Sequence, residues 1–136
     1  MEITGLIKSA LKAREFAYVP ISGFRVGAAL LSKSGGIFNG CNIENASFSP
    51  TNCAERTAFF KAVSEGEREF DAIAIVGGYK GEPEDYCPPC GVCRQVMLEF
   101  CAPDFMVILA KNEHDYRTYT LDELIPHSFG PSALKK

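Results

Sequence analysis

Three cysteines and one glutamate have the side-chain types and the spacing for metal chemistry. Cys53 and Glu55 are two positions apart, so on a helix their side chains diverge by about 200° and can contact different parts of one site. Cys90 and Cys93 are three positions apart and share one helix face, so both thiols can bind one ion. Three protein ligands and one open position are typical of catalytic zinc. The spacing therefore predicts a zinc centre held by the three thiols, with Glu55 beside it.

The local sequence also favours the thiolate form that binds metal. Cys53 and Cys90 begin predicted helices, where free N–H groups and partial positive charge stabilise an anion. A thiolate is the metal-binding form of cysteine. Pro89, immediately before Cys90, suits the start of a helix.

Cys87 leaves two alternatives open. A fourth thiolate would close the coordination sphere and make a structural zinc site, in which Glu55 has no role. A dithiol redox motif at Cys90 and Cys93 is the second alternative, but it leaves the Cys53–Glu55 pair unexplained. Pro88 and Pro89 hold Cys87 in extended backbone outside the helix. We therefore interpret Cys87 as a bystander thiol.

The other cysteines and histidines have no ligand spacing to these groups. Cys41 and Cys101 are expected to be buried packing residues, as free cysteines usually are. His114 lies in a predicted polar turn and His127 in a proline-rich segment. Both histidines are expected at the surface.

Composition limits the class of protein. The chain has 136 residues, 46% of them hydrophobic, and a net charge of −3, which predicts one soluble globular domain over residues 1–136. Scattered Lys and Arg residues argue against a nucleic-acid partner. No apolar run reaches the roughly 20 residues that span a membrane, and no signal peptide is recognisable at the N-terminus. We expect a cytoplasmic protein, in which reduced thiols are more common than disulfides.

Periodicity predicts the elements that position these residues. Apolar residues at helical spacing, Phe16 and Val92 among them, predict helices over 3–17, 53–65, 90–101 and 121–125. Apolar and alternating runs predict strands over 24–32, 37–43, 72–76, 105–110 and 116–120. This order indicates an α/β fold, a three-layer α-β-α sandwich with helices on both faces of a mixed five-stranded sheet. The tail after Pro131 is expected to be loose.

The chain resembles the small homotetrameric cytidine deaminases, which act on free nucleosides. Zinc deaminases have a His- or Cys-x-Glu followed by Pro-Cys-x-x-Cys, and here Cys53-Ala54-Glu55 precedes Pro89-Cys90-Gly91-Val92-Cys93. Further segments similar to the family are 24–31, 40–46, 53–58 and 93–96, within a resemblance that runs from about 18 to 129.

The resemblance implies roles for the residues of the metal centre. Cys53, Cys90 and Cys93 would hold one Zn²⁺ per subunit, with water in the fourth position. Glu55 would carry protons from that water to N3 of cytosine and to the departing ammonia. Three thiolates on Zn²⁺ leave a net charge of −1, which opposes ionisation of the water. Arg56 would offset this charge by hydrogen bonding to thiolates, as the matching residue does in relatives.

The resemblance also implies a substrate pocket. Phe24 would pack on the base, Asn42 and Glu44 would bind the ribose hydroxyls, and the backbone of Ala54 would contact the base. Family members complete each pocket with residues of neighbouring subunits, among them an aromatic residue that corresponds here to Phe129. Phe48 departs from the family, which often has tyrosine at that position.

These features predict deamination of cytidine and deoxycytidine to uridine and deoxyuridine, within pyrimidine salvage. Three alternatives stay open at this point. A related enzyme could act on another aminopyrimidine nucleoside, such as a blasticidin-type antibiotic. A deaminase that edits RNA or DNA fits the acidic composition less well. A non-catalytic zinc module would need four thiolates and no exchangeable water.

Overall fold

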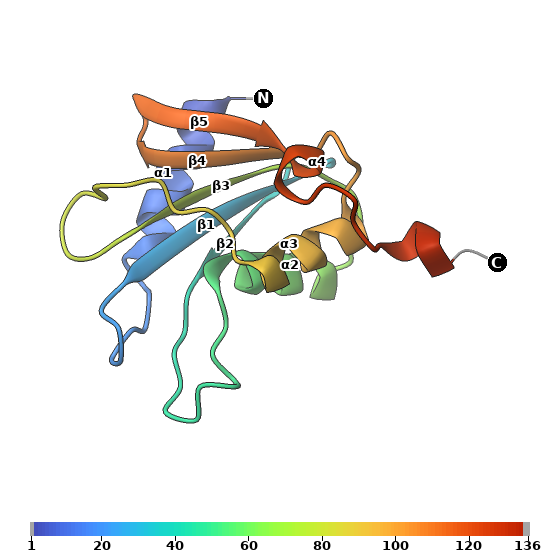
Figure 1. Ribbon diagram of the computed structural model, residues 1–136. Helices are drawn as coiled ribbons and strands as arrows, with labels where there is room; N and C mark the ends of the chain where they lie inside the picture. Colours follow the sequence, from blue (N-terminus) through green and yellow to red (C-terminus); the bar gives the residue numbers. More distant parts are fainter. Residues whose placement is uncertain (1, 135–136) are drawn as a thin grey trace.

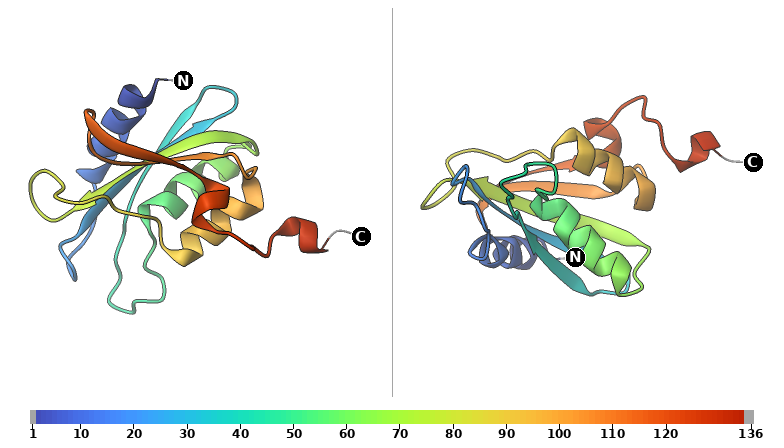
Figure 2. Two further views of the ribbon diagram at one scale, coloured as in Figure 1. Left: turned by 45° about the horizontal axis from the view of Figure 1, so that its top comes forward. Right: turned by 90° about the horizontal axis from the view of Figure 1, so that it is seen from below.

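A mixed five-stranded sheet lies between helices on both of its faces, as Figures 1 and 2 show. This computed structural model describes residues 2–134. The elements in chain order are α1 (Ile3–Arg14), β1 (Arg25–Ser32), β2 (Ile37–Cys41), α2 (Ala54–Ser64), β3 (Phe70–Gly78), α3 (Gly91–Phe100), β4 (Met106–Asn112), β5 (Asp115–Thr120), α4 (Leu121–Leu124) and a 3₁₀ helix (Pro131–Leu134). The predicted α-β-α sandwich is confirmed. None of the helices between residues 2 and 134 is long and apolar enough to cross a membrane.

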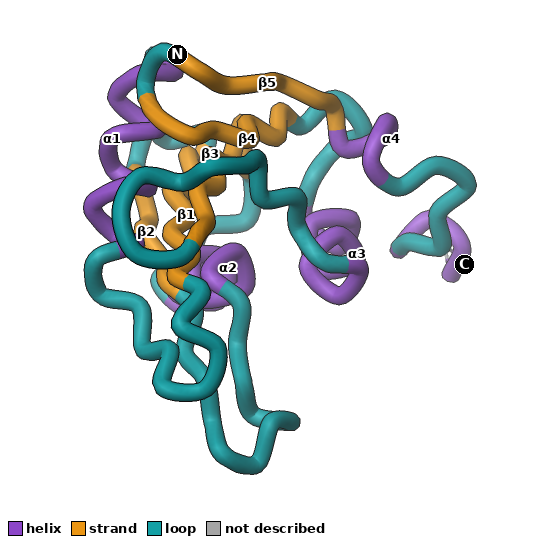
Figure 3. The backbone as a smooth tube through the Cα atoms, turned by 60° about the vertical axis from the view of Figure 1, so that its left-hand side comes forward, coloured by secondary structure: helices purple, strands orange, loops and turns teal. Residues whose placement is uncertain are grey.

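Strand order places α2 and α3 side by side. The sheet runs β2-β1-β3-β4-β5, and β3–β4 is its parallel pair, whereas the other neighbours are antiparallel. A parallel pair needs a crossover connection, which contains α3. Figure 3 shows α2 and α3 next to each other, with α1 across the sheet from them.

Side chains of the central strands alternate between the two faces of the sheet, and this divides the core into two layers. On β1, Ala28 and Leu30 pack in the cluster that contains α2 and α3, whereas Ala29 packs in the α1 cluster. On β3, Ile73 and Ile75 belong to the first cluster. Successive strand residues point to opposite faces, and the α1 face is richer in alanine. Small side chains there let α1 lie close to the sheet.

Gly40 fixes the height of α2 above the sheet. A Cβ atom at this position would lie 2.4 Å from the carbonyl oxygen of Ala54 and 2.5 Å from the amide nitrogen of Ala58. Only glycine therefore allows the first turn of α2 to rest directly on β2. Because Cys53 is the N-cap of α2 and Glu55 lies in its first turn, this contact positions two site residues.

Two predicted helical faces are wrong in detail. The helix expected over 3–17 ends at Arg14, and Phe16 is exposed beyond it. Val92, expected on the apolar side of α3, is also exposed, while Cys93 and Met97 are the buried residues of that helix. Phe16 therefore lies outside the helix, and Val92 lies on a part of the α3 surface that the core does not cover.

The strand ends also differ from the prediction. The segment expected as a strand over 72–76 extends from Phe70 to Gly78, because β1 pairs with it along nearly its whole length. The first strand begins at Arg25 rather than at 24, and the second ends at Cys41 rather than at 43. The tail expected to be loose contains the short 3₁₀ helix over Pro131–Leu134.

Replacement of Gly40 tests the contact that positions α2. We expect Gly40→Ala to lower the free energy of unfolding by about 1–3 kcal/mol, because the methyl group meets backbone that cannot rotate away. Urea unfolding at equilibrium measures the change. Gly5→Ala is the matched control, since the added Cβ meets only the flexible Glu2 side chain and a helix interior favours alanine. Equal stability of Gly40→Ala and the wild type would contradict the proposed contact.

Candidate metal centre and adjoining cleft

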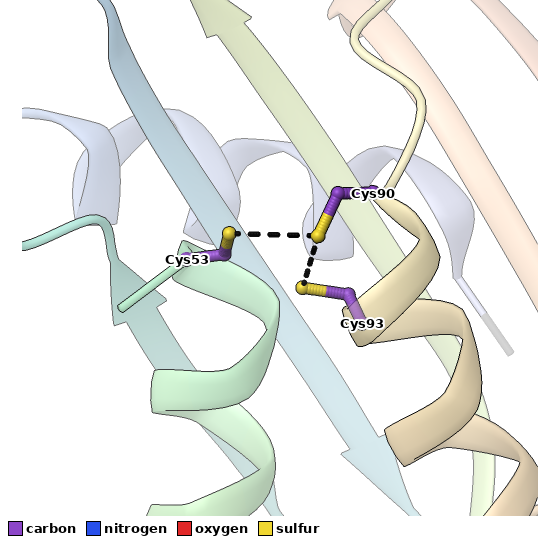
Figure 4. Close-up of side chains that lie close together, drawn as sticks. All are labelled: Cys53, Cys90 and Cys93. Carbon is purple, nitrogen blue, oxygen red and sulfur yellow. Dashed lines mark hydrogen bonds between the residues drawn. The ribbon is translucent and has the colours of Figure 1, made fainter. Parts of the chain in front are cut away.

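Three thiols meet where α2 and α3 begin (Figure 4). The Sγ atoms of Cys53 and Cys90 are 3.8 Å apart, and those of Cys90 and Cys93 are 3.5 Å apart. All three ligand atoms lie within 4.8 Å of one another. Two sulfurs bound tetrahedrally to zinc at about 2.3 Å lie about 3.8 Å from each other. The donor types and their spacing therefore fit one zinc ion.

The start of each helix supplies a favourable environment for a thiolate. Cys53 and Cys90 are the N-caps of α2 and α3, and N-terminal N–H groups attract negative charge. A hydrogen bond from the Cys93 thiol, together with one from Arg56, lowers the pKa of Cys53 to about 5 despite its burial. The Nη2 atom of Arg56 donates to Cys53 Sγ at 3.4 Å. The bond with Cys53 and burial raise the pKa of Cys93.

Glu55 is a buried carboxyl group, with only 4% of its surface exposed. Burial is the main cause that raises its pKa to about 7, and the negative charge of Cys53 acts in the same direction. A carboxyl group with a pKa near neutrality can both accept and release a proton at physiological pH. This is the property that a proton carrier in the site requires.

Cys87 lies outside the three-thiol cluster. Its Sγ atom packs against Gly77, 2.7 Å from the position that a Cβ atom on that glycine would occupy. Burial raises the pKa of Cys87 to about 12. Within residues 2–134 the group that can hold a metal consists of Cys53, Cys90 and Cys93. The arrangement of the described residues therefore favours a three-thiol site over the closed four-thiolate alternative.

The remaining cysteines and histidines are also away from the centre. Burial raises the pKa of Cys101 to about 12 and also that of Cys41, as fits partly buried packing thiols. His114 and His127 are exposed, as expected.

A cleft of about 360 Å³ opens beside the thiols. It brings together most of the predicted site residues, which are distant in the sequence. Its lining comprises Ser22, Phe24, Val26, Asn42, Glu44, Cys53, Ala54, Glu55, Cys87, Pro88 and Cys90. Phe129 is not part of the lining. It is 64% exposed and lies after α4, where its carbonyl oxygen accepts a hydrogen bond from Gln95, in a segment that extends away from the sheet (Figure 1).

Two polar residues of the cleft are held by backbone contacts. Asn42 accepts a hydrogen bond from the Val26 amide at 2.9 Å and donates one to the Phe24 carbonyl at 2.8 Å. Glu44 accepts hydrogen bonds from the amides of Ile21 and Ser22 at 2.9 and 3.0 Å. These bonds fix the direction of both side chains toward the cleft.

Ser22 is a site residue that the sequence did not indicate. Its hydroxyl donates to Glu44, accepts from the Phe24 amide at 3.0 Å, and is the main cause that lowers the pKa of Glu44. Ser22 lies between Pro20 and Gly23. From the sequence, these two residues indicate only the end of a helix. Its role depends on the approach of residues 21–24 to residue 44, for which the sequence contains no local signal.

The chain is similar to known proteins over most of its length. The family model for the cytidine and deoxycytidylate deaminase zinc-binding region matches residues 2–109. The chain belongs to this family. A cytidine deaminase of Halalkalibacterium halodurans is 55% identical over 124 residues, which cover 91% of each chain. A cytidine deaminase of Sporosarcina psychrophila is 50% identical over 134 residues, 98% of this chain and 96% of the relative.

Solved structures in the family have the same fold. The crystal structure of cytidine deaminase from Burkholderia pseudomallei superposes with a TM-score of 0.87 and 47% identity, covering 95% of this chain and all of the other. Membership of a zinc-binding deaminase family and the three-thiol cluster agree on Zn²⁺ as the cofactor.

Removal of single thiols tests which residues bind zinc. We expect Cys53→Ala and Cys93→Ala to lose stoichiometric zinc, because two thiolates hold the ion far more weakly than three. Cys87→Ala is the matched control and should retain one zinc per chain. Elemental analysis after dialysis gives the ratio for each variant. Full zinc content in Cys53→Ala would identify Cys87 as a ligand.

Proposed function

We propose that this protein catalyses the hydrolytic deamination of cytidine and deoxycytidine to uridine and deoxyuridine, with release of ammonia, in pyrimidine salvage. One observation carries the proposal: a buried carboxyl group, Glu55, stands beside three convergent thiols at a cleft of about 360 Å³. The family of the chain supports the same reaction.

Cys53, Cys90 and Cys93 are the residues we assign to zinc. When bound, zinc supplies Lewis-acid activation of the water that replaces the amino group. The three thiolates carry −3, zinc carries +2, and the Arg56 guanidinium beside Cys53 carries +1, so the group as a whole is neutral. Arg56 thereby lessens the excess negative charge that thiolate ligands place on the ion.

Glu55 moves the protons. Its carboxylate takes a proton from the attacking water and passes it to N3 of the pyrimidine. The water oxygen forms a bond to C4, which becomes tetrahedral. Glu55 then takes the second proton from that oxygen and delivers it to the exocyclic nitrogen, and the bond between C4 and the nitrogen breaks as ammonia leaves. One carboxyl group can serve both steps because its pKa, about 7, lies near the working pH.

The rest of the cleft has groups that suit a nucleoside. Phe24 offers an aromatic surface for the base, and the buried backbone of Ala54 lies next to Glu55. Asn42 retains a second amide hydrogen and a second lone pair for a ribose hydroxyl. Glu44 is an acceptor for hydroxyl groups, and hydrogen bonding by Ser22 favours its ionised form.

We also propose that the cleft is completed in a homotetramer. Phe129 is 64% exposed and Phe48 69% exposed, and Phe48 has a positive φ of 59°, which is uncommon for a bulky residue. Exposed aromatic side chains of this size suit contacts between subunits. A cytoplasmic location stays a prediction.

Substitution of the proposed proton carrier tests the mechanism. We expect Glu55→Gln to retain zinc and fold but to lower kcat by at least about 100-fold, because the amide cannot carry a proton. Ultraviolet absorbance of cytidine follows turnover, with elemental analysis as the check on metal. Glu65→Gln, at the C-terminal end of α2, is the matched control. Normal turnover in Glu55→Gln would exclude the mechanism.

A substrate panel separates the proposed function from its alternatives. We expect ammonia release from cytidine and deoxycytidine, loss of release when a chelator removes zinc, and weak or no release from blasticidin S. Activity only on the antibiotic, or only on cytosine within an oligonucleotide, would replace the proposed substrate class.

The assembly is tested by its mass and by one aromatic residue. We expect light scattering after size exclusion to give four times the chain mass of 14.9 kDa. Phe129→Ala should raise KM for cytidine, because the residue would close the cleft of another subunit. A fully active monomer would contradict the shared pocket.

A further inference from the structure

Phe24 forms a wall between two hollows of the molecule. One side of the residue lines the cleft beside the thiols. Phe24 also lines a second hollow of about 190 Å³, on the side of residues 77–86. The ring that we assign to the base packs against the core over part of its surface and faces the second hollow over another part. The side chains that line the second hollow therefore determine how firmly the Phe24 ring is held.

Tyr79 supports the ring from that second side. The ring centroids of Phe24 and Tyr79 are 5.1 Å apart and their planes meet at 85°, an edge-to-face contact. Such pairs are favourable beyond the area that they bury. Tyr79 itself is 66% exposed, so burial of its own ring does little to hold it in place. Its position depends on the backbone that carries it.

One guanidinium holds that backbone. Arg14 Nη2 donates to the carbonyl oxygens of Gly78, at 3.0 Å, and of Tyr79, while Nη1 donates to Gly81 at 2.8 Å.

The same guanidinium also binds the strand next to Phe24. Its Nε atom donates to the carbonyl oxygen of Arg25 at 3.2 Å. A single side chain therefore joins the two backbone segments that carry the aromatic pair. Arg14 is the last residue of α1, on the face of the sheet opposite the thiols. It cannot touch a substrate in the cleft.

We propose that Arg14 and Tyr79 are positioning residues for the base: Arg14 clamps the segment 78–81, and Tyr79 holds the Phe24 ring against the pyrimidine. This inference rests on the function proposed above. It predicts that loss of either residue weakens nucleoside binding more than it slows the chemical steps, because Glu55 and the thiols are held by other elements.

The first experiment removes the supporting ring. We expect Tyr79→Ala to raise KM for cytidine about 2- to 10-fold, the range of an aromatic pair, with a smaller change in kcat. Tyr79→Phe keeps the aromatic edge and should restore the wild-type KM. Tyr116→Ala removes another exposed tyrosine, on β5, and should leave KM unchanged.

A double-mutant cycle shows whether Tyr79 acts through Phe24. If it does, Tyr79→Ala has no further effect on KM in a Phe24→Ala background. An equal rise of KM in both backgrounds would overturn the proposal, as would an unchanged KM in Tyr79→Ala. The melting temperature of each variant separates these results from unfolding.

The second experiment replaces the guanidinium group of Arg14 with an ammonium group. Lysine cannot make four directed bonds, so we expect Arg14→Lys to raise KM in the same way. Arg68→Lys is the matched control, because Arg68 also donates to two carbonyl groups, those of Val63 and Glu67, at the opposite end of α2. A rise in KM for both variants, or for neither, would overturn the role of Arg14.

Binding of uridine, the product, gives a readout that does not need turnover. Calorimetric Kd values for uridine should follow the KM values across the variants. If the wild type binds uridine but does not deaminate cytidine, the proposed function fails while the test of Arg14 and Tyr79 still stands. Equal uridine affinity in the wild type and in Tyr79→Ala would overturn the inference.

Discussion

The site depends on two helices that begin at the same place. The β3–α3–β4 crossover brings the start of α3 beside that of α2, on one face of the sheet. Each helix start contributes free N–H groups and partial positive charge. This field and the Arg56 guanidinium, which donates to Cys53, offset part of the repulsion that three thiolates would have for one another. Without the close contact at Gly40 the first turn of α2 would be displaced, and the cluster with it.

The same arrangement explains why the pKa of Glu55 is raised. A buried carboxylate next to thiolates is repelled and poorly solvated, and both effects favour its protonated form. A cation among the sulfurs acts in the opposite direction. The protonation state of the carboxyl group therefore depends on a balance: burial and the nearby thiolates favour the protonated form, and a cation favours the ionised form. Such a group changes its charge readily, which a residue that must be first a base and then an acid requires.

Local sequence patterns predicted the chemical groups of the site better than they predicted where helices and strands end. Spacing on a helix start linked Cys53 with Glu55 and Cys90 with Cys93, and the ligand number of zinc and the family resemblance joined the two pairs in one site. The end of α1 could not be predicted, because Ala17 is buried although it lies outside the helix and Phe16 is exposed. Tertiary contacts decide those positions. The hydrogen bonds of Ser22 and Arg14 are likewise long-range, and no local motif marks them.

The residues proposed for chemistry and those proposed for recognition come from different parts of the fold. The thiols and Glu55 stand on helices that pack on the core, whereas Phe24, Asn42 and Glu44 lie just outside the ends of β1 and β2. In an antiparallel pair the start of one strand adjoins the end of the other, so these residues meet at one edge of the sheet. The connection from β2 to α2 leaves from the same edge. If the proposed roles hold, substitutions in the connecting segments alter substrate preference while the proposed proton-transfer group, Glu55, stays in place.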